Sequence, residues 1–70
     1  MMQEYMIIIE PTDTGYSAYA PDLPGCITVG DTVEETKAFM KEAVNLYIDT
    51  LKEKEMPIPP PSVLSDFIVV

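Results

Sequence analysis

Three short apolar stretches, separated by turn-forming residues, precede one long stretch with a helical repeat. Residues 4–10 (EYMIIIE) carry apolar side chains on both faces of a strand, which is typical of a strand inside a sheet. Residues 16–20 alternate two rows of side chains, and the alanines of one row favour a face on which a helix packs closely. Residues 26–29 predict a third short strand. The turn formers of residues 11–15 predict a hairpin loop between the first two strands, with Gly15 in the left-handed conformation.

A tight turn is predicted between the second and third strands. Pro24 presets φ at the first central position of a type II turn, and Gly25 supplies the positive φ required at the second. Asp22 can accept a hydrogen bond from the backbone two residues on and so hold the start of the loop. Leu23 is an apolar side chain that this loop must pack against something else.

The helical repeat is predicted to begin after Thr32 and to extend over residues 33–54. Thr32 is a candidate N-cap because Glu35 stands three residues later, where a capping-box carboxylate reaches back to the N–H of the cap. Asp31 with Glu34 is the alternative register. One side of the helix should face the sheet with an apolar stripe made of Val33, Thr36, Met40, Ala43, Val44, Tyr47 and Leu51. The stripe is widened at its two edges by Phe39, Leu46 and Ile48.

The end of the sequence predicts a stiff connector and a last strand. Residues 56–62 (MPIPPPS) contain four prolines, which favour a polyproline II conformation and exclude both helix and central strand. Residues 66–70 (DFIVV) are too apolar to be left in water. A strand–helix–strand crossover is right-handed and returns parallel to the sheet. The predicted fold is therefore α+β, with the element order β-β-β-α-β, a sheet of order 3-2-1-4 and one helix packed on one face. The other face of the sheet needs a further cover.

Composition adds constraints on partners. Seventy residues allow one domain, residues 1–70, whose core buries only about 60% of the surface of the unfolded chain, so we expect a homo-oligomer. A single cysteine excludes an internal disulfide, and the absence of a signal-peptide pattern predicts a cytoplasmic protein. No apolar run approaches the roughly 20 residues of a membrane helix.

Four lysines, no arginine and twelve carboxylates give a formal net charge of −8. That charge disfavours direct binding of nucleic acid and suits a basic protein partner, although simple solubility is the alternative explanation.

The chain offers little catalytic chemistry. It contains no histidine, so a Ser/His or Cys/His nucleophile pair is excluded. Asp13, Asp22 and Asp31 are the best candidates for an Mg²⁺ site, but each has a sufficient structural role in a turn or cap. Cys26 has no cation or metal motif beside it, which predicts a buried and inert thiol at the start of the third strand. We therefore expect a protein that is not an enzyme and that uses no cofactor or metal.

Residues 16–35, YSAYAPDLPGCITVGDTVEE, resemble the HicB-like family, whose members include the antitoxin half of HicA/HicB toxin–antitoxin pairs. The matching features are an aromatic-rich strand, P-D-L-P-G-C, G-D-T with two glutamates that open a helix, and the proline-rich exit at residues 57–61. The resemblance implies a module like a truncated ribonuclease H fold that binds a small ribonuclease toxin, without nuclease activity of its own. Many members continue into a DNA-binding domain, whereas this chain stops at Val70. We therefore expect a short form that does not bind operator DNA.

The leading hypothesis is an antitoxin that neutralises a small basic RNA-cleaving toxin of the HicA type by occlusion, and that forms a dimer or tetramer. One alternative is a solitary oligomeric HicB-like module with an adaptor or small-ligand role, and another is a vestigial nuclease. A short, basic, histidine-containing neighbouring reading frame would favour the first hypothesis over the second. The predicted contact surface combines an acidic helix face with one apolar anchor from the loop, and it consists of Leu23, Glu34, Glu35, Glu42 and Asp49.

Overall fold

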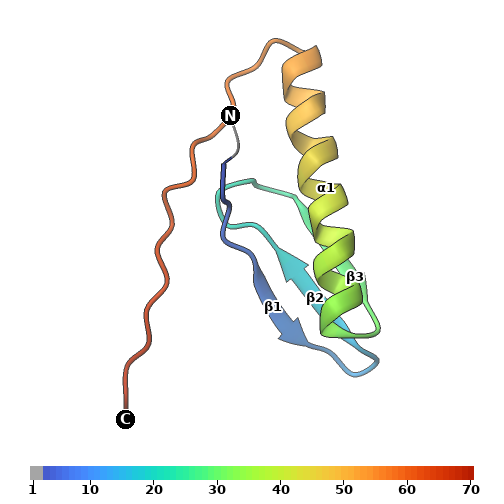
Figure 1. Ribbon diagram of the computed structural model, residues 1–70, viewed down its shortest axis with the longest axis vertical. Helices are drawn as coiled ribbons and strands as arrows, with labels where there is room; N and C mark the ends of the chain where they lie inside the picture. The colour runs from blue at the N-terminus through green and yellow to red at the C-terminus, as the bar shows by residue number, and fades with distance from the viewer. Residues whose placement is uncertain (1–2) are drawn as a thin grey trace.

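The computed structural model describes residues 3–70, and within them three strands are followed by one helix. Strands β1 (Ile8–Pro11), β2 (Tyr16–Tyr19) and β3 (Ile27–Gly30) form an antiparallel sheet of order β1-β2-β3. Helix α1 (Val33–Glu53) lies along one face of this sheet (Figure 1). The predicted α+β class and the predicted order of the first three strands are confirmed.

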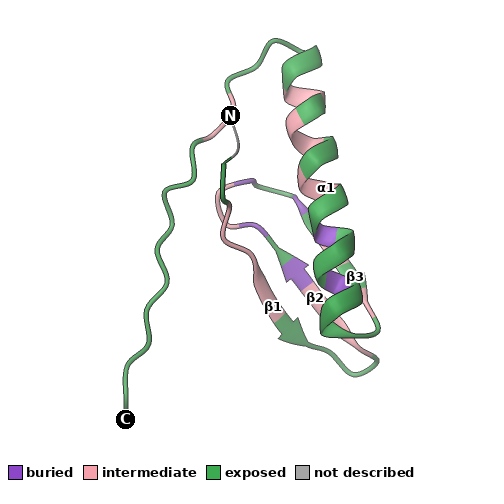
Figure 2. Ribbon diagram, in the orientation of Figure 1, coloured by how far each residue is buried: buried purple, intermediate pink, exposed green. Residues whose placement is uncertain are grey.

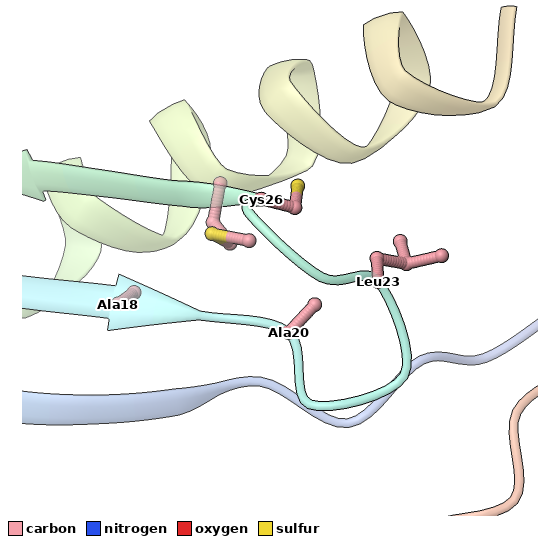
Figure 3. Close-up of a cluster of buried hydrophobic side chains, with 5 residues drawn as sticks. Ala18, Ala20, Leu23 and Cys26 are labelled. Atoms are coloured by element: carbon pink, nitrogen blue, oxygen red, sulfur yellow. The ribbon is translucent and has the colours of Figure 1, made fainter. Parts of the chain in front are cut away.

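The sheet register divides its side chains into a covered row and an open row. Ala18 of β2 stands opposite Ile9 of β1 and Thr28 of β3, and this row faces α1. The helix packs mainly on β3 and β2, where the alanines leave room for it. A small core results, in which strand, loop and helix side chains meet (Figure 3). The buried apolar residues are Ala18, Ala20, Leu23, Cys26 and Met40.

The loop between β2 and β3 consists of two successive turns. The N–H of Leu23 donates to the carbonyl of Ala20 at 3.0 Å, and the N–H of Cys26 donates to the carbonyl of Leu23 at 3.0 Å. Gly25 has a φ of 82°, as the second central position of a type II turn requires. The Tyr47 hydroxyl of α1 donates to the carbonyl of Pro24 at 3.0 Å and ties the loop to the helix. The predicted Pro-Gly turn is confirmed.

The hairpin loop between β1 and β2 closes as predicted, but Gly15 has a different role from the one expected. The N–H of Thr12 donates to the carbonyl of Gly15 at 2.8 Å, and Gly15 does not have a positive φ. A Cβ atom at this position would collide with the carbonyl oxygen of Gly30. Glycine is therefore needed here because two backbones approach closely, which local turn patterns do not reveal.

Thr32 caps α1, and the alternative register with Asp31 as the cap is not adopted. The Thr32 Oγ1 accepts the N–H of Glu35 at 3.0 Å. The capping box predicts that the Glu35 carboxylate accepts the N–H of Thr32. In the structure it accepts the N–H of Asp31 instead, at 3.1 Å. The predicted N-cap is thus confirmed, with its reciprocal bond shifted one residue toward the N-terminus.

The end of α1 is a Schellman motif. The N–H of Glu55 donates to the carbonyl of Lys52 at 3.1 Å, and the N–H of Met56 donates to the carbonyl of Leu51 at 2.9 Å. Glu55 has a φ of 55°, in the left-handed region that favours glycine. This motif turns the chain away from the helix axis and directs the connector back across the top of the sheet (Figure 1).

The first and last predicted strands differ from the structure. The first was predicted over residues 4–10 inside the sheet, whereas β1 begins at Ile8 and lies at an edge. Residues 4–7 have no ladder partner within the described chain, because β2 ends at Tyr19, opposite Ile8. Residues 66–70 form no strand: they are exposed and run outside β1 (Figure 2). Within residues 3–70, no strand pairs with residues 66–70, so the structure has the predicted order 3-2-1 but not the predicted fourth strand beside β1.

Candidate protein-binding surface

Three acidic residues of α1 form one stripe. Glu35, Glu42 and Asp49 follow one another at intervals of seven residues, which places them on one side of a helix with only a small angular drift. All three are exposed, and they face away from the side on which Thr36 and Met40 are buried. We call these three residues the acidic stripe.

The fourth predicted helix carboxylate lies elsewhere. Glu34 is exposed but is rotated by about 100° from Glu35, and it lines a groove together with Lys37 and Lys41. Glu35 itself is partly engaged, because its Oε1 accepts the N–H of Asp31. The four predicted acidic contact residues are therefore not one cluster.

Two exposed apolar side chains border the acidic stripe. Phe39 and Leu46 are also seven residues apart, and Leu46 lies one turn from both Glu42 and Asp49. Leu46 is 69% exposed and Phe39 is 43% exposed, so the two side chains together place apolar surface beside the acidic stripe. The available signal was the width of the apolar arc, which both residues extend beyond the side that faces the sheet. They were not among the predicted contact residues.

Leu23, by contrast, was predicted as an apolar anchor for a partner, and this prediction is wrong. Its side chain is 0% exposed and belongs to the core with Ala20 and Cys26 (Figure 3). The turn from Ala20 to Leu23 closes the loop at this point, and the side chain is buried as part of the core cluster. It has no surface left with which to contact another protein.

The face of the sheet opposite α1 is open and apolar. Tyr19 of β2 pairs with Ile8 of β1 and with Ile27 of β3, and this row points away from the helix. Ile27 is 64% exposed and Val29 is 65% exposed. The structure thus leaves uncovered the face that the sequence predicted to need a second cover.

A groove of about 600 Å³ runs between residues 3–7 and α1. It exists because α1 sits over β3 and β2 and leaves the inner side of the first extended stretch only partly covered. The apolar lining comes from Tyr5, Ile7, Ala38, Met40 and Val44, and the polar lining from Gln3, Glu34, Lys37, Lys41 and Asn45. Ile58 of the connector lines a neighbouring hollow that shares Tyr5 and Val44 with this groove.

The candidate metal ligands have separate structural surroundings. Within residues 3–70, Asp13, Asp22 and Asp31 are not brought together into a group that could hold a metal ion. Asp22 instead accepts hydrogen bonds from the Ser62 hydroxyl at 2.9 Å, from the Ser62 N–H at 3.2 Å and from the Val63 N–H at 3.3 Å. Desolvation raises the pKa of Asp22, but these hydrogen bonds lower it by more, so its net pKa lies below the usual value.

Cys26 is buried, as predicted, but it lies immediately before β3 and not within it, because the strand begins at Ile27. Burial raises the pKa of its thiol, which favours the unreactive protonated form. In the described part of the chain, no helix is both long enough and apolar enough to cross a membrane.

Comparison with known proteins places this fold in a family. The model of the HicB-like antitoxin of bacterial toxin–antitoxin systems matches residues 5–69. An uncharacterised 14.9 kDa protein of Haemophilus phage HP1 is 34% identical over 64 residues, which are 91% of this chain and 48% of the phage protein. Antitoxin HicB 2 of Photorhabdus laumondii is 34% identical over 65 residues, which are 93% of this chain and 47% of that antitoxin. This chain therefore spans about half the length of these two relatives.

A solved structure agrees with the sequence matches. A chain of the HicA3 and HicB3 toxin–antitoxin complex superposes with a TM-score of 0.73 and 33% sequence identity, covering 84% of this chain and 70% of that chain. The three-stranded sheet with one helix on one face thus defines an α+β protein of the HicB type. The chain belongs to the HicB-like antitoxin family of bacterial toxin–antitoxin systems.

Proposed function

We propose that this protein is an antitoxin that binds a small basic RNA-cleaving toxin of the HicA type and blocks it by occlusion. The proposal is supported by the family, by the likeness to a chain of a HicA3 and HicB3 complex, and by a formal net charge of −8. Its action is non-catalytic, it takes no cofactor and contacts no nucleic acid directly. It acts in the cytoplasm, as one unit comprising residues 1–70.

The single observation that carries the proposal is the exposed acidic stripe beside Phe39 and Leu46. A row of carboxylates on one helix face creates a negative field that speeds the encounter with a basic partner and disfavours acidic ones. Exposed apolar side chains next to it supply the contact area that slows dissociation once the partners have met. Glu34 lies at the margin of this surface, and the buried Leu23 is not part of it.

The decisive experiment is co-expression with the product of the adjacent small reading frame. We expect the two proteins to co-purify and this chain to relieve the growth arrest that the toxin causes. Failure of both would overturn the proposal and leave a solitary HicB-like module with an adaptor or small-ligand role.

A charge-reversal pair tests the acidic stripe within such a complex. Glu42→Lys with Asp49→Lys should slow association with the toxin and flatten its salt dependence. These two positions lie away from the N-cap, so the helix start is undisturbed. The matched control is Glu10→Lys with Asp13→Lys, which changes the net charge equally on the hairpin. Equal slowing by both pairs would show that only the total charge matters and would remove the acidic stripe from the contact surface.

Leu46→Ala tests the apolar part of the same surface. We expect faster dissociation with little change in the association rate, because an uncharged contact acts after encounter. The variant should keep its stability, since Leu46 is mostly exposed. An unchanged dissociation rate would exclude Leu46 from the interface.

A further inference from the structure

The C-terminal segment, residues 63–70, is extended, apolar and exposed (Figure 2). Leu64 and Phe67 are each 92% exposed, and Val69 is fully exposed. Within the segment, apolar side chains occupy both alternating rows, so either face of an extended strand would be apolar. A contiguous apolar surface of this kind is typical of an interaction site.

The base of the segment is fixed to the folded part of the protein. Asp22 accepts three hydrogen bonds from Ser62 and Val63, and the Tyr5 hydroxyl donates to the carbonyl of Pro59 at 2.5 Å. Ile58 is half-buried beside the groove between residues 3–7 and α1. The point and direction of departure are therefore defined, and from there the segment runs along the β1 side of the molecule without packing on it (Figure 1).

The outer edge of β1 offers an open position for a strand. Within residues 3–70, no strand pairs with this edge, and residues 4–7 have a strand-like sequence without a ladder partner. A strand added there would have the groove on one side and the open sheet face with Tyr19 and Ile27 on the other. Both sides carry apolar side chains, as both rows of the C-terminal segment do. The groove rim also carries Lys37 and Lys41, opposite in charge to Asp66 of the segment, although Glu34 lies beside them.

We propose that the C-terminal segment of one copy adds as a strand to the β1 edge of a second copy, and that the exchange is reciprocal. The occupant is a second copy because, within one copy, residues 64–70 pass β1 exposed and without a ladder partner, although Ser62 and Val63 are anchored at Asp22. A two-fold arrangement buries both apolar segments and both grooves at once. It also extends β1 toward residue 4, which accounts for the strand-like sequence of residues 4–7. The inference is independent of the toxin partner, whose proposed surface lies on another side of α1.

Sedimentation equilibrium of the whole chain tests the association. We expect a dimer at micromolar concentration, and Phe67→Asp with Val69→Asp should raise its dissociation constant about 100-fold or more by placing carboxylates in an apolar interface. Both positions are exposed within a single copy, so the folded protomer is retained and circular dichroism should be unchanged. The matched control is Leu46→Asp, which adds a charge at an exposed apolar position outside the groove and should leave the dimer intact. A wild-type chain that stays monomeric, or equal weakening by the control, would overturn the exchange.

Isotope-filtered NMR on a mixture of labelled and unlabelled chains separates exchange from closure within one copy. We expect contacts between chains that join the side chains of residues 64–69 to Ile7, Met40 or Val44 in the groove. Contacts found only within one chain would show that the segment closes on its own β1 edge. That result would overturn the proposal while leaving the antitoxin function untouched.

Discussion

The loop between β2 and β3 and the C-terminal segment are both apolar in sequence, yet only the loop is buried. Leu23 of the loop is 0% exposed, whereas Leu64 of the segment is 92% exposed. The loop is closed by hydrogen bonds among residues 20–26, all of them close in sequence. The segment is held only at its base, by the contact of Asp22 with Ser62 forty residues away.

This difference shows which apolar residues a small domain can bury by itself. Local turns place Leu23 over the core at a small cost in loop entropy, and the proline and glycine of the turn lower that cost further. The C-terminal segment would need a complete strand position, which the three-stranded sheet provides only at an open edge. Its burial therefore requires pairing with such an edge.

The sharpest test of this comparison is the truncation of one leucine in each region. Leu23→Ala should lower the free energy of unfolding by about 2–5 kcal/mol, because it leaves a cavity in a core of very few side chains. Leu64→Ala should change it by no more than about 0.5 kcal/mol at concentrations where the chain is monomeric. Urea unfolding measures both values. A similar loss for both variants in the monomer would show that the segment packs on its own domain.

Cys26 tests the same core at a second position. Cys26→Ser should lower the free energy of unfolding by about 1–3 kcal/mol, since a hydroxyl would be buried without an assured partner. Cys26→Ala, which buries no polar atom, should cost less. Thiol reagents should label the native protein slowly, because burial protects the thiol and raises its pKa. Labelling at the rate of the unfolded chain would contradict this placement.

The parts of the fold that the sequence predicted depend on neighbouring residues. The Pro24-Gly25 turn and the Thr32 cap follow from turn chemistry, and the structure has both. The helical repeat correctly places Thr36 and Met40 on the buried side of α1, but Val33, the first residue of the predicted stripe, is 40% exposed. The fourth strand was inferred from apolar composition and crossover handedness. Neither of these shows whether a pairing partner lies within the same chain. The local pattern at Gly15 does not reveal its constraint, because the carbonyl of Gly30 is distant in sequence.

The sequence predicted only part of the candidate site, because only part of it depends on residues that are close in sequence. Periodicity correctly placed Glu35, Glu42 and Asp49 on an exposed helix side. It could not show that Leu23 turns inward, because that depends on how the loop meets the sheet and helix. No local sequence pattern predicts the contact of Asp22 with Ser62 or the groove between residues 3–7 and α1, since each joins segments that are far apart in sequence.

The turn that joins α1 to the proline connector contains a left-handed backbone conformation, and a glycine there would remove its energetic cost. Glu55 has a φ of 55° at the end of α1, where a side chain costs roughly 1 kcal/mol relative to glycine. Glu55→Gly should therefore raise the free energy of unfolding by up to about 1 kcal/mol, as measured in urea. Lys54→Gly is the matched control, because Lys54 has a φ of −86° and gains nothing from glycine. Equal effects of the two changes would exclude the left-handed conformation as the cause.

The smallest expected effect is the response to pH of the hydrogen bonds that Asp22 accepts from Ser62 and Val63. The pKa of Asp22 is lowered in the folded chain by its hydrogen bonds from Ser62 and Val63, against a usual value of 3.8. A lowered pKa means that folding favours the ionised carboxylate. The contribution of Asp22 to the free energy of unfolding is therefore complete above pH 3.8 and is lost as the pH falls through the lower folded value.

We expect the amide protons of Ser62 and Val63 to shift and exchange faster with solvent in that acidic range, while those of Ala20 and Cys26 stay protected. In Asp22→Asn the Ser62 and Val63 amides should show no such titration. Acid titration of these amides that persists in the Asn variant would show that another group holds the base of the segment.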